Sequence, residues 1–300
     1  MKHKLIMVEG IPGSGKTTFA KKIAARLRDL GYNATCYNES DIHPADLSWI
    51  AVLTTAQYEH LLQKWPSYAD QIRAQAWQES NRVLVAYSNV EVTRKEDEAL
   101  YDDFAPYEVY DGKWSLADFT AIHLERWQRF STQAQQEEHI AVFECAWLQN
   151  HVNELMMFHN KTQAEMLQHL QQLWDIVAPL NPLVIYLQPE DVTDSIAKVS
   201  AARVNKQGEP VWRDRVIEVV CQSPFGKAHQ LQGMAGMTEY FRIRNQVELQ
   251  MLKQLPAGAH IFTRSGDDWQ TLWQQVDTLL AGKFQPGAVH AFATNAFTPH

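Results

Sequence analysis

A short apolar run that leads directly into a glycine-rich loop limits the folds open to this chain more than any other feature. Leu5 to Val8 form a continuous apolar run, which is typical of a strand buried on both faces of a parallel sheet. Three glycines follow, and apolar residues then recur every three or four positions from Phe19 to Leu30. Gly31 stands where a helix would end. The sequence therefore predicts a strand, a glycine loop and a helix in succession.

The loop has the residue types that phosphate binding requires. Backbone N–H groups converge on one anion only where glycine lets the chain curl tightly, and the following helix N-terminus adds partial positive charge. Lys16 would then reach the β- and γ-phosphates, and the Thr17 hydroxyl would lie at Mg²⁺. We expect the phosphates of ATP, or of GTP, to be bound by Gly10, Ile11, Pro12, Gly13, Ser14, Gly15, Lys16, Thr17 and Thr18.

Strand and helix patterns alternate again in the second half of the chain. Buried strands are predicted at residues 139–143, 182–187 and 260–263. Helical patterns separate or follow them at residues 162–177, 191–199, 240–255 and 269–280. Thr162 and Glu165 have the spacing of a capping box, and Asp191 can cap the next helix. The pattern predicts a three-layer α/β fold, in which a five-stranded parallel sheet carries helices on both faces.

Two segments interrupt this core. Residues 45–137 are rich in Trp, Tyr and Gln, and we expect them to form a mainly helical insertion between the second and third strands. Residues 203–237 turn locally basic and contain several glycines, which favours a mobile, lid-like segment. We therefore expect one domain over residues 1–284, followed by an irregular C-terminal tail over residues 285–300.

The opening LIMVEGIPGSGKTTFAKKIA resembles that of the P-loop kinases of nucleosides, nucleotides and other small molecules, thymidylate-kinase-type enzymes in particular. The close match covers about the first 30 residues. The resemblance implies a five-stranded parallel core with the phosphoryl acceptor beside the ends of the second and third strands. It also implies an arginine-bearing lid after the fourth strand. No motif beyond the loop indicates which acceptor is used.

Acidic residues follow two of the expected strands. In similar kinases an acid after the second strand accepts the proton of the acceptor hydroxyl, and we expect Asp41 to do so, with Glu39 as second choice. Glu144 ends the third strand, where such folds hold Mg²⁺ or its water, and Thr17 would be the other metal ligand. A glutamate at this place departs from the commonest pattern. The alternative for the first pair is a solvated acidic turn.

The remaining candidates lie after the third and fourth strands. Gln149, Asn150 and Asn153 offer amide groups to an acceptor. Arginines on a closing lid suit the charge of a transferring phosphoryl group, and we expect Arg203 and Arg213 to act there beside Lys16 of the loop. The alternative for the arginines is a charged surface loop.

Composition disfavours some classes of function. The net charge of −8 weighs against general nucleic-acid binding. The mean hydropathy is −0.36, and no apolar run approaches the roughly 18 to 20 residues of a membrane span. Because the apolar run begins at Leu5, we also expect no signal peptide. We expect a cytoplasmic protein without a membrane partner. The sequence leaves the oligomeric state open.

The leading hypothesis is thus an ATP- and Mg²⁺-dependent kinase of a small-molecule acceptor, with nucleosides or nucleotides first among the candidates. The alternative is a P-loop ATPase or nucleotide-dependent switch that has no small-molecule acceptor, although neither an NKxD motif nor a DExx box is present. A kinase of nucleic-acid ends is weakened by the net charge of −8.

Overall fold

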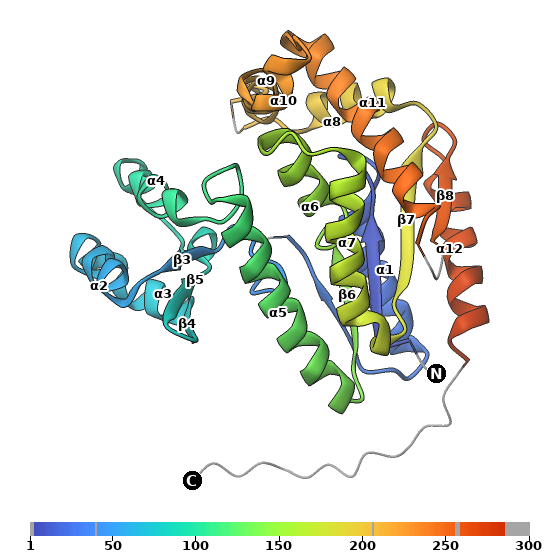
Figure 1. Cartoon of the computed structure of the whole chain (residues 1–300), viewed down its shortest axis with the longest axis horizontal. Helices are drawn as coiled ribbons and strands as arrows, with labels where there is room; N and C mark the ends of the chain where they lie inside the picture. The colour runs from blue at the N-terminus through green and yellow to red at the C-terminus, as the bar shows by residue number, and fades with distance from the viewer. Residues whose placement is uncertain (1–2, 40, 206, 256–258, 286–300) are drawn as a thin grey trace.

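A five-stranded, all-parallel sheet lies at the centre of the molecule (Figure 1). Its strands are β1 (Leu5–Glu9), β2 (Ala34–Tyr37), β6 (Ile140–Glu144), β7 (Leu183–Pro189) and β8 (His260–Arg264), in the order β2-β6-β1-β7-β8. The computed structural model describes residues 3–39, 41–205, 207–255 and 259–285. Apart from Gln285, the predicted C-terminal tail lies outside the described residues. The prediction of an α/β fold with a five-stranded parallel sheet is confirmed.

Strands β1 and β6 are buried along their whole length, and β7 is buried except at Gln188, which explains their largely apolar sequences. In β1, Leu5 and Met7 join one hydrophobic core, whereas Ile6 and Val8 join another on the opposite face of the sheet. Both β1 and β6 end in a buried glutamate, Glu9 in β1 and Glu144 in β6. Parallel strands end at the same edge, so their polar ends gather on one side of the molecule.

Helices cover both faces of the sheet (Figure 1). On one face lie α1 (Lys16–Asp29) and α12 (Trp269–Lys283). The other face carries α5 (Leu116–Gln136), α7 (Gln163–Val177), α8 (Val192–Ala202) and α11 (Gly233–Leu252). The chain therefore forms the three layers that the alternating pattern predicted.

Several helix ends lie where the sequence predicted them. Gly31, with φ of 88°, follows α1 directly after its C-cap residue. The Thr162 hydroxyl accepts from the backbone N–H of Glu165, whose side chain accepts from the N–H of Thr162. The Asp191 side chain accepts two backbone N–H groups at the start of α8. These caps satisfy N–H groups that have no partner within the helix.

The insertion predicted at residues 45–137 contains a small sheet as well as helices. Its helices are α2 (Thr55–Lys64), α3 (Ala69–Ala74), α4 (Ala99–Phe104) and α5. A three-stranded antiparallel sheet, β3 (Ala51–Leu53), β5 (Arg82–Val85) and β4 (Ala76–Glu79), was not predicted. Strands of three or four residues are too short to give a clear alternating pattern. The lobe of α2–α4 and β3–β5 projects from the main body beside α5 (Figure 1).

The segment predicted as a lid, residues 203–237, is largely helical where the structure describes it. It contains α9 (Val211–Gln222), α10 (Pro224–Ala228) and the beginning of α11. Helix α9 packs against α11, and α11 packs against α8. Short 3₁₀ turns elsewhere cover Pro66–Tyr68, Tyr87–Asn89, Lys95–Glu98, Ala105–Tyr107 and Ala178–Leu180.

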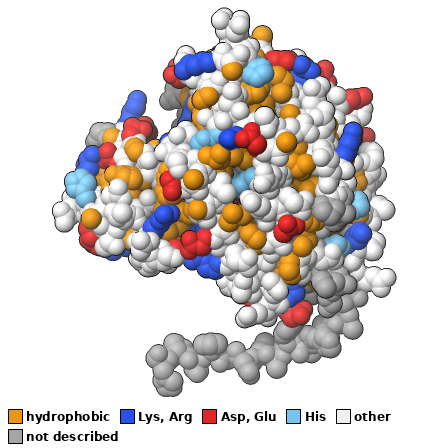
Figure 2. Space-filling model, in the orientation of Figure 1, with side chains coloured by type: hydrophobic (Ala, Val, Ile, Leu, Met, Phe, Trp, Pro, Cys, Tyr) orange, Lys and Arg blue, Asp and Glu red, His pale blue; other side chains and the backbone are white. Residues whose placement is uncertain are grey.

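The surface carries charges of both signs. On the face drawn in Figure 2, Lys and Arg side chains are interspersed with Asp and Glu. The described part of this face has no extended basic area of the kind that a polyanion requires. Within the residues that the structure describes, no helix combines the length and the apolar character needed to cross a bilayer.

We expect Thr162→Ala to lower the free energy of unfolding by about 1 kcal/mol, because it removes the hydroxyl that caps α7. Thermal unfolding should report a melting temperature lower by roughly 2 °C or more. The matched control is Thr132→Ala, at an exposed position inside α5, which should change the stability by less than about 0.5 kcal/mol. Equal melting temperatures for Thr162→Ala and the unmodified protein would contradict a stabilising cap.

Candidate functional site

One cleft, with a volume of about 820 Å³, lies at the edge of the main sheet where β1, β2 and β6 end. The glycine loop of residues 10–18 forms one wall. The segment after β2, helix α6 (Gln149–Asn153) and helices α8, α9, α11 and α12 contribute the others. A π-helical turn, Glu154–Phe158, continues α6. Side chains from distant parts of the sequence thus meet over the ends of the strands.

The glycine loop adopts a curled conformation that only glycine allows at two positions. Gly13 and Gly15 have φ of 82° and 92°, in the left-handed region. A Cβ atom on Gly15 would lie 2.5 Å from a ring carbon of Trp269, and one on Gly13 would lie 2.8 Å from the Ser195 hydroxyl. The loop therefore lies directly against α12 and α8.

This curl leaves several backbone donors available. The N–H groups of Gly13, Gly15 and Lys16 make no hydrogen bond within the described residues. They lie immediately before and at the first residue of α1, where the helix dipole adds partial positive charge. Such an arrangement of N–H groups is suited to an anion with several oxygens, such as a phosphate.

Lys16 and Thr17 extend from the loop toward the cleft. Lys16 is 6% exposed, and its Nζ donates to the carbonyl oxygen of Ile11 at 3.0 Å. No ion pair involves Lys16 among the described residues, so its charge is available to a ligand. The Thr17 hydroxyl donates to Oε1 of Glu144 at 3.2 Å. Hydroxyl and carboxylate oxygens are ligands that Mg²⁺ prefers, so Thr17 and Glu144 fit this ion.

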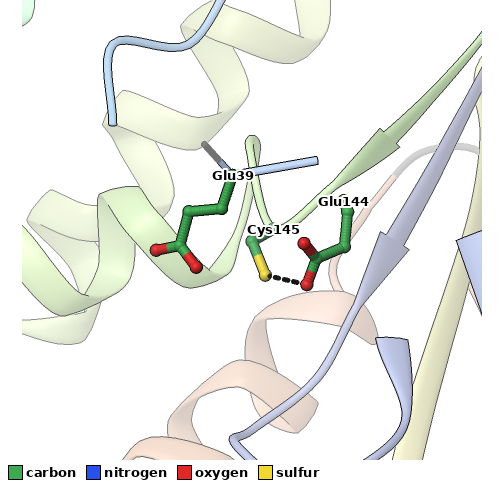
Figure 3. A group of neighbouring side chains, drawn as sticks. All are labelled: Glu39, Glu144 and Cys145. Atoms are coloured by element: carbon green, nitrogen blue, oxygen red, sulfur yellow. Dashed lines mark hydrogen bonds between the residues drawn. The ribbon is translucent and has the colours of Figure 1, made fainter. Parts of the chain in front are cut away.

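Glu144 lies beside two other candidate ligands, Glu39 and Cys145 (Figure 3). One ligand atom from each of the three residues lies within 4.8 Å of the others. The Cys145 thiol donates to Oε1 of Glu144 at 2.8 Å, and burial raises the pKa of this thiol. The pKa of Glu39 is raised to about 7, mainly by burial and further by the carboxylates of Glu144 and Asp46.

The structure separates the two acids proposed after β2. Glu39 lines the cleft, whereas Asp41 does not. Oδ2 of Asp41 accepts from the backbone N–H and the side-chain amide of Asn38, both at 2.7 Å. Asp41 thus closes the turn that carries Glu39. The second choice from the sequence is the carboxylate that reaches the cleft.

The basic residues of the predicted lid also differ in position. Arg203 lines the cleft, with its guanidinium 5.0 Å from the ring centre of Trp212. Arg213 does not line it, and pairs with Asp214 at 2.8 Å. Arg215, which the sequence reasoning did not select, does line it. The sequence held a signal for Arg215: it stands three positions after Trp212, and residues three apart share a helix face. Arg213, next to Trp212, points to another face.

The amide groups of α6 are held by a buried arginine that the sequence reasoning missed. Arg244 of α11 is 2% exposed and donates to Oδ1 of Asn153 at 3.2 Å and to Oε1 of Gln149 at 3.4 Å. Glu248, one turn along α11, lies 3.0 Å from Nε of Arg244 and balances its charge. An Arg and a Glu four residues apart were the available signal, since they stand on a helix face whose other buried residues are mostly apolar.

A second missed residue, Glu9, connects the glycine loop to α6. Its carboxylate is fully buried and accepts three backbone N–H groups, from Trp147, Leu148 and Gln149, each at 3.0 Å. Burial raises the pKa of Glu9 to about 7, although these three hydrogen bonds favour its charged form. Glu9 therefore fixes the start of α6 directly against the end of β1.

No protein-family profile matches the chain, and no curated protein matches its sequence. The chemistry of the cleft therefore follows from its own residues. These provide backbone donors and an ammonium group for an anion, two oxygen ligands for a divalent ion, and a carboxylate beside them with a pKa of about 7.

The raised pKa of Glu39 predicts a pH dependence of stability. The folded protein holds a proton on Glu39 between pH 4.5 and about 7 that the unfolded chain releases, so rising pH across this window lowers the free energy of unfolding. In Glu39→Gln this contribution is absent. The variant should gain stability relative to the unmodified protein, by up to about 3 kcal/mol, as the pH rises through the window. Urea unfolding at several pH values measures the difference.

The control for this measurement is Glu59→Gln, at an exposed position on α2. Its stability relative to the unmodified protein should not follow the same trend. A constant difference between Glu39→Gln and the unmodified protein across the window would show that Glu39 titrates normally.

Proposed function

We propose that this protein is an ATP- and Mg²⁺-dependent phosphotransferase that acts on a small molecule. The observation that carries the proposal is that one cleft contains both the glycine loop and, beside it, Glu39 with the amides of α6. A phosphate donor at the loop would place its terminal phosphate next to these side chains. The cleft extends past the loop, which is what a second substrate requires and a hydrolytic switch does not.

The donor side consists of groups that bind and neutralise phosphate. The free N–H groups of Gly13, Gly15 and Lys16 and the Lys16 ammonium would hold the phosphates of ATP or GTP. Thr17 and Glu144 would hold Mg²⁺, which when bound neutralises charge on the β- and γ-phosphates. Beyond the loop, Trp269 offers an aromatic surface to a nucleobase.

The transfer step follows from the position of Glu39. The acceptor hydroxyl oxygen bonds to the γ-phosphorus while the bond from phosphorus to the bridging oxygen breaks and the nucleoside diphosphate leaves. The hydroxyl proton passes to Glu39, whose pKa of about 7 suits a base at neutral pH. Arg203 and Arg215 line the cleft and would stabilise the charge spread over the transferring group.

Label transfer separates this proposal from the alternatives. The protein is incubated with γ-labelled ATP and with separate pools of nucleosides, nucleotides, sugars and aminoglycosides. Label in an acceptor pool supports a phosphotransferase. Release of labelled inorganic phosphate at a rate that no pool changes would favour the ATPase or switch instead. Nucleic-acid ends, which the net charge of −8 disfavours, form one further arm.

Lys16→Ala should lower acceptor phosphorylation by at least about 100-fold, because it removes the charge that faces the γ-phosphate. Circular dichroism should show an unchanged fold. Lys21→Ala is the matched control, since Lys21 is exposed on the same helix and does not line the cleft. Normal turnover in a folded Lys16→Ala protein would rule out the proposed role of the loop.

Glu39→Gln and Asp41→Asn should have different effects on turnover. Removing the base should lower kcat by about 100-fold or more in Glu39→Gln, with little change in the affinity for Mg·ATP. Asp41→Asn keeps a carbonyl oxygen for the Asn38 turn and should retain most of the activity. Steady-state kinetics of both variants measure this. Loss of turnover in Asp41→Asn alone would return the role of base to Asp41.

A further inference from the structure

A smaller cavity of about 100 Å³ adjoins the main cleft on the side of the insertion. The two share five wall residues, Glu39, Trp49, Asp111, Asn150 and Asn153. Glu39, the proposed base, thus lies where the two meet. The remaining walls are Ser48, Glu108 and Tyr110, which all belong to the insertion. Chain segments outside the main sheet therefore shape the place where an acceptor would lie.

The walls of this side cavity are acidic. Glu39, Glu108 and Asp111 line it, and no Lys or Arg does among the described residues. Lys113 lies behind the wall, with its Nζ 2.6 Å from Glu108 and 3.5 Å from Asp111. Counting Lys113, the three acids less one ammonium leave an excess of between one and two negative charges at neutral pH, because Glu39, with a pKa of about 7, is only partly ionised. An anionic group would be repelled here, whereas a cation would be attracted.

The three carboxylates of the side cavity differ in how many hydrogen bonds and ion pairs they already make. Glu108 accepts from the Tyr87 hydroxyl at 2.5 Å as well as from Lys113, so both its oxygens are engaged. Asp111 has only the longer approach of Lys113, and Glu39 has no hydrogen bond or ion pair among the described residues. Asp111 and Glu39 are therefore the two acids open to a ligand.

The neighbouring amides have orientations that are already fixed. Oδ1 of Asn153 accepts from the Tyr240 hydroxyl at 2.8 Å and from Arg244. The NH₂ group of Asn153 therefore points away from these two residues and is available as a donor. Asn150 donates to Asp46 and Ser48, and its Oδ1 has no partner among the described residues although the side chain is only 7% exposed. A donor and an acceptor side by side suit hydroxyl groups, which do both.

Trp49 supplies the apolar surface of the cavity. Its side chain is 36% exposed, and its backbone φ of 62° is unusual for a bulky residue. The guanidinium of Arg215 lies 5.7 Å from the centre of its ring and lines the main cleft but not the side cavity. An exposed indole beside acids and amides is typical of a site for a hydroxylated ring.

We propose that the side cavity binds the phosphoryl acceptor, and that this acceptor is an amino sugar or a similar amine-bearing polyol. The inference rests on the proposed function and names the substrate class for it. The amine would bind Asp111, hydroxyl groups would bind Asn150 and Asn153, and the reacting hydroxyl would face Glu39. A nucleoside monophosphate would instead bring its phosphate against carboxylates.

Calorimetric titration of the full chain tests the substrate class. The ligands are glucosamine, kanamycin A, glucose and thymidine 5′-monophosphate, each with and without a non-hydrolysable Mg·ATP analogue. Glucose differs from glucosamine in having a hydroxyl in place of the ammonium group, so it isolates the effect of charge. Glucosamine should bind about tenfold or more tightly than glucose, because a charged hydrogen bond is lost in glucose. Thymidine 5′-monophosphate should not bind.

Asp111→Asn keeps the shape of the wall and removes its charge, so it should lower the affinity for glucosamine about tenfold. The affinity for the ATP analogue should not change. The matched control Asp102→Asn, at an exposed position on α4, should bind both like the unmodified protein.

The other possible binding results would contradict either the amine-bearing acceptor or the proposed function. Tighter binding of glucose or of the monophosphate than of glucosamine would exclude an amine-bearing acceptor. If neither glucosamine nor kanamycin A binds while the ATP analogue does, an amine-bearing acceptor is also excluded, but the proposed function is not contradicted. Failure of the analogue alone to bind would remove the proposed function and with it the acceptor role, whereas the affinity for glucosamine without nucleotide would still test the side cavity as a site for an amine-bearing polyol.

Discussion

Three carboxylates stand at one edge of a buried parallel sheet, and the rest of the site depends on how each is compensated. Burial of an unpaired charge is costly, so each acid needs hydrogen bonds, a counter-ion or a proton. Glu9 receives three backbone N–H groups, and Glu144 receives the hydroxyl of Thr17 and the thiol of Cys145. Glu39 receives no hydrogen bond and no ion pair from the described residues, and burial raises its pKa to about 7 although the nearby charges of Lys16 and Arg203 lower it. The carboxylate least satisfied by the protein is thus the one that we propose as the base.

Part of this arrangement could be predicted from the sequence because it depends on local patterns. Strands buried on both faces must be apolar throughout, and the capping residues Thr162 and Asp191 act on N–H groups two or three positions away. The glycines of the loop likewise need only their own backbone conformation. For such features the interacting residues lie close together in the sequence, so their spacing along the chain predicts their contacts in space.

The rest depends on contacts between distant segments. Glu9 binds residues about 140 positions away, and Arg244 binds amides about 90 positions away, so no local pattern identifies either. The choice between Glu39 and Asp41 depends on a turn in which Asn38 binds Asp41. The choice between Arg213 and Arg215 depends on which face of α9 is turned to the cleft. The short strands of the insertion pack against side chains from α2, α3, α4 and the turns between them, which the alternating pattern does not include.

The insertion has a hydrophobic core of its own, in which Leu61, Ile72, Val85 and Phe104 pack together apart from the two cores that flank the main sheet. Residues that hold phosphate and metal would come from the main sheet and its loop, whereas Trp49, Tyr110 and Asp111 belong to the inserted segment. Trp49, Tyr110 and Asp111 lie outside the core of this lobe, and Tyr110 packs instead against a separate cluster that includes Leu47, Ile50 and Ile122. In evolutionary terms, the inserted segment could vary in sequence while the main sheet and the glycine loop stay under separate selection.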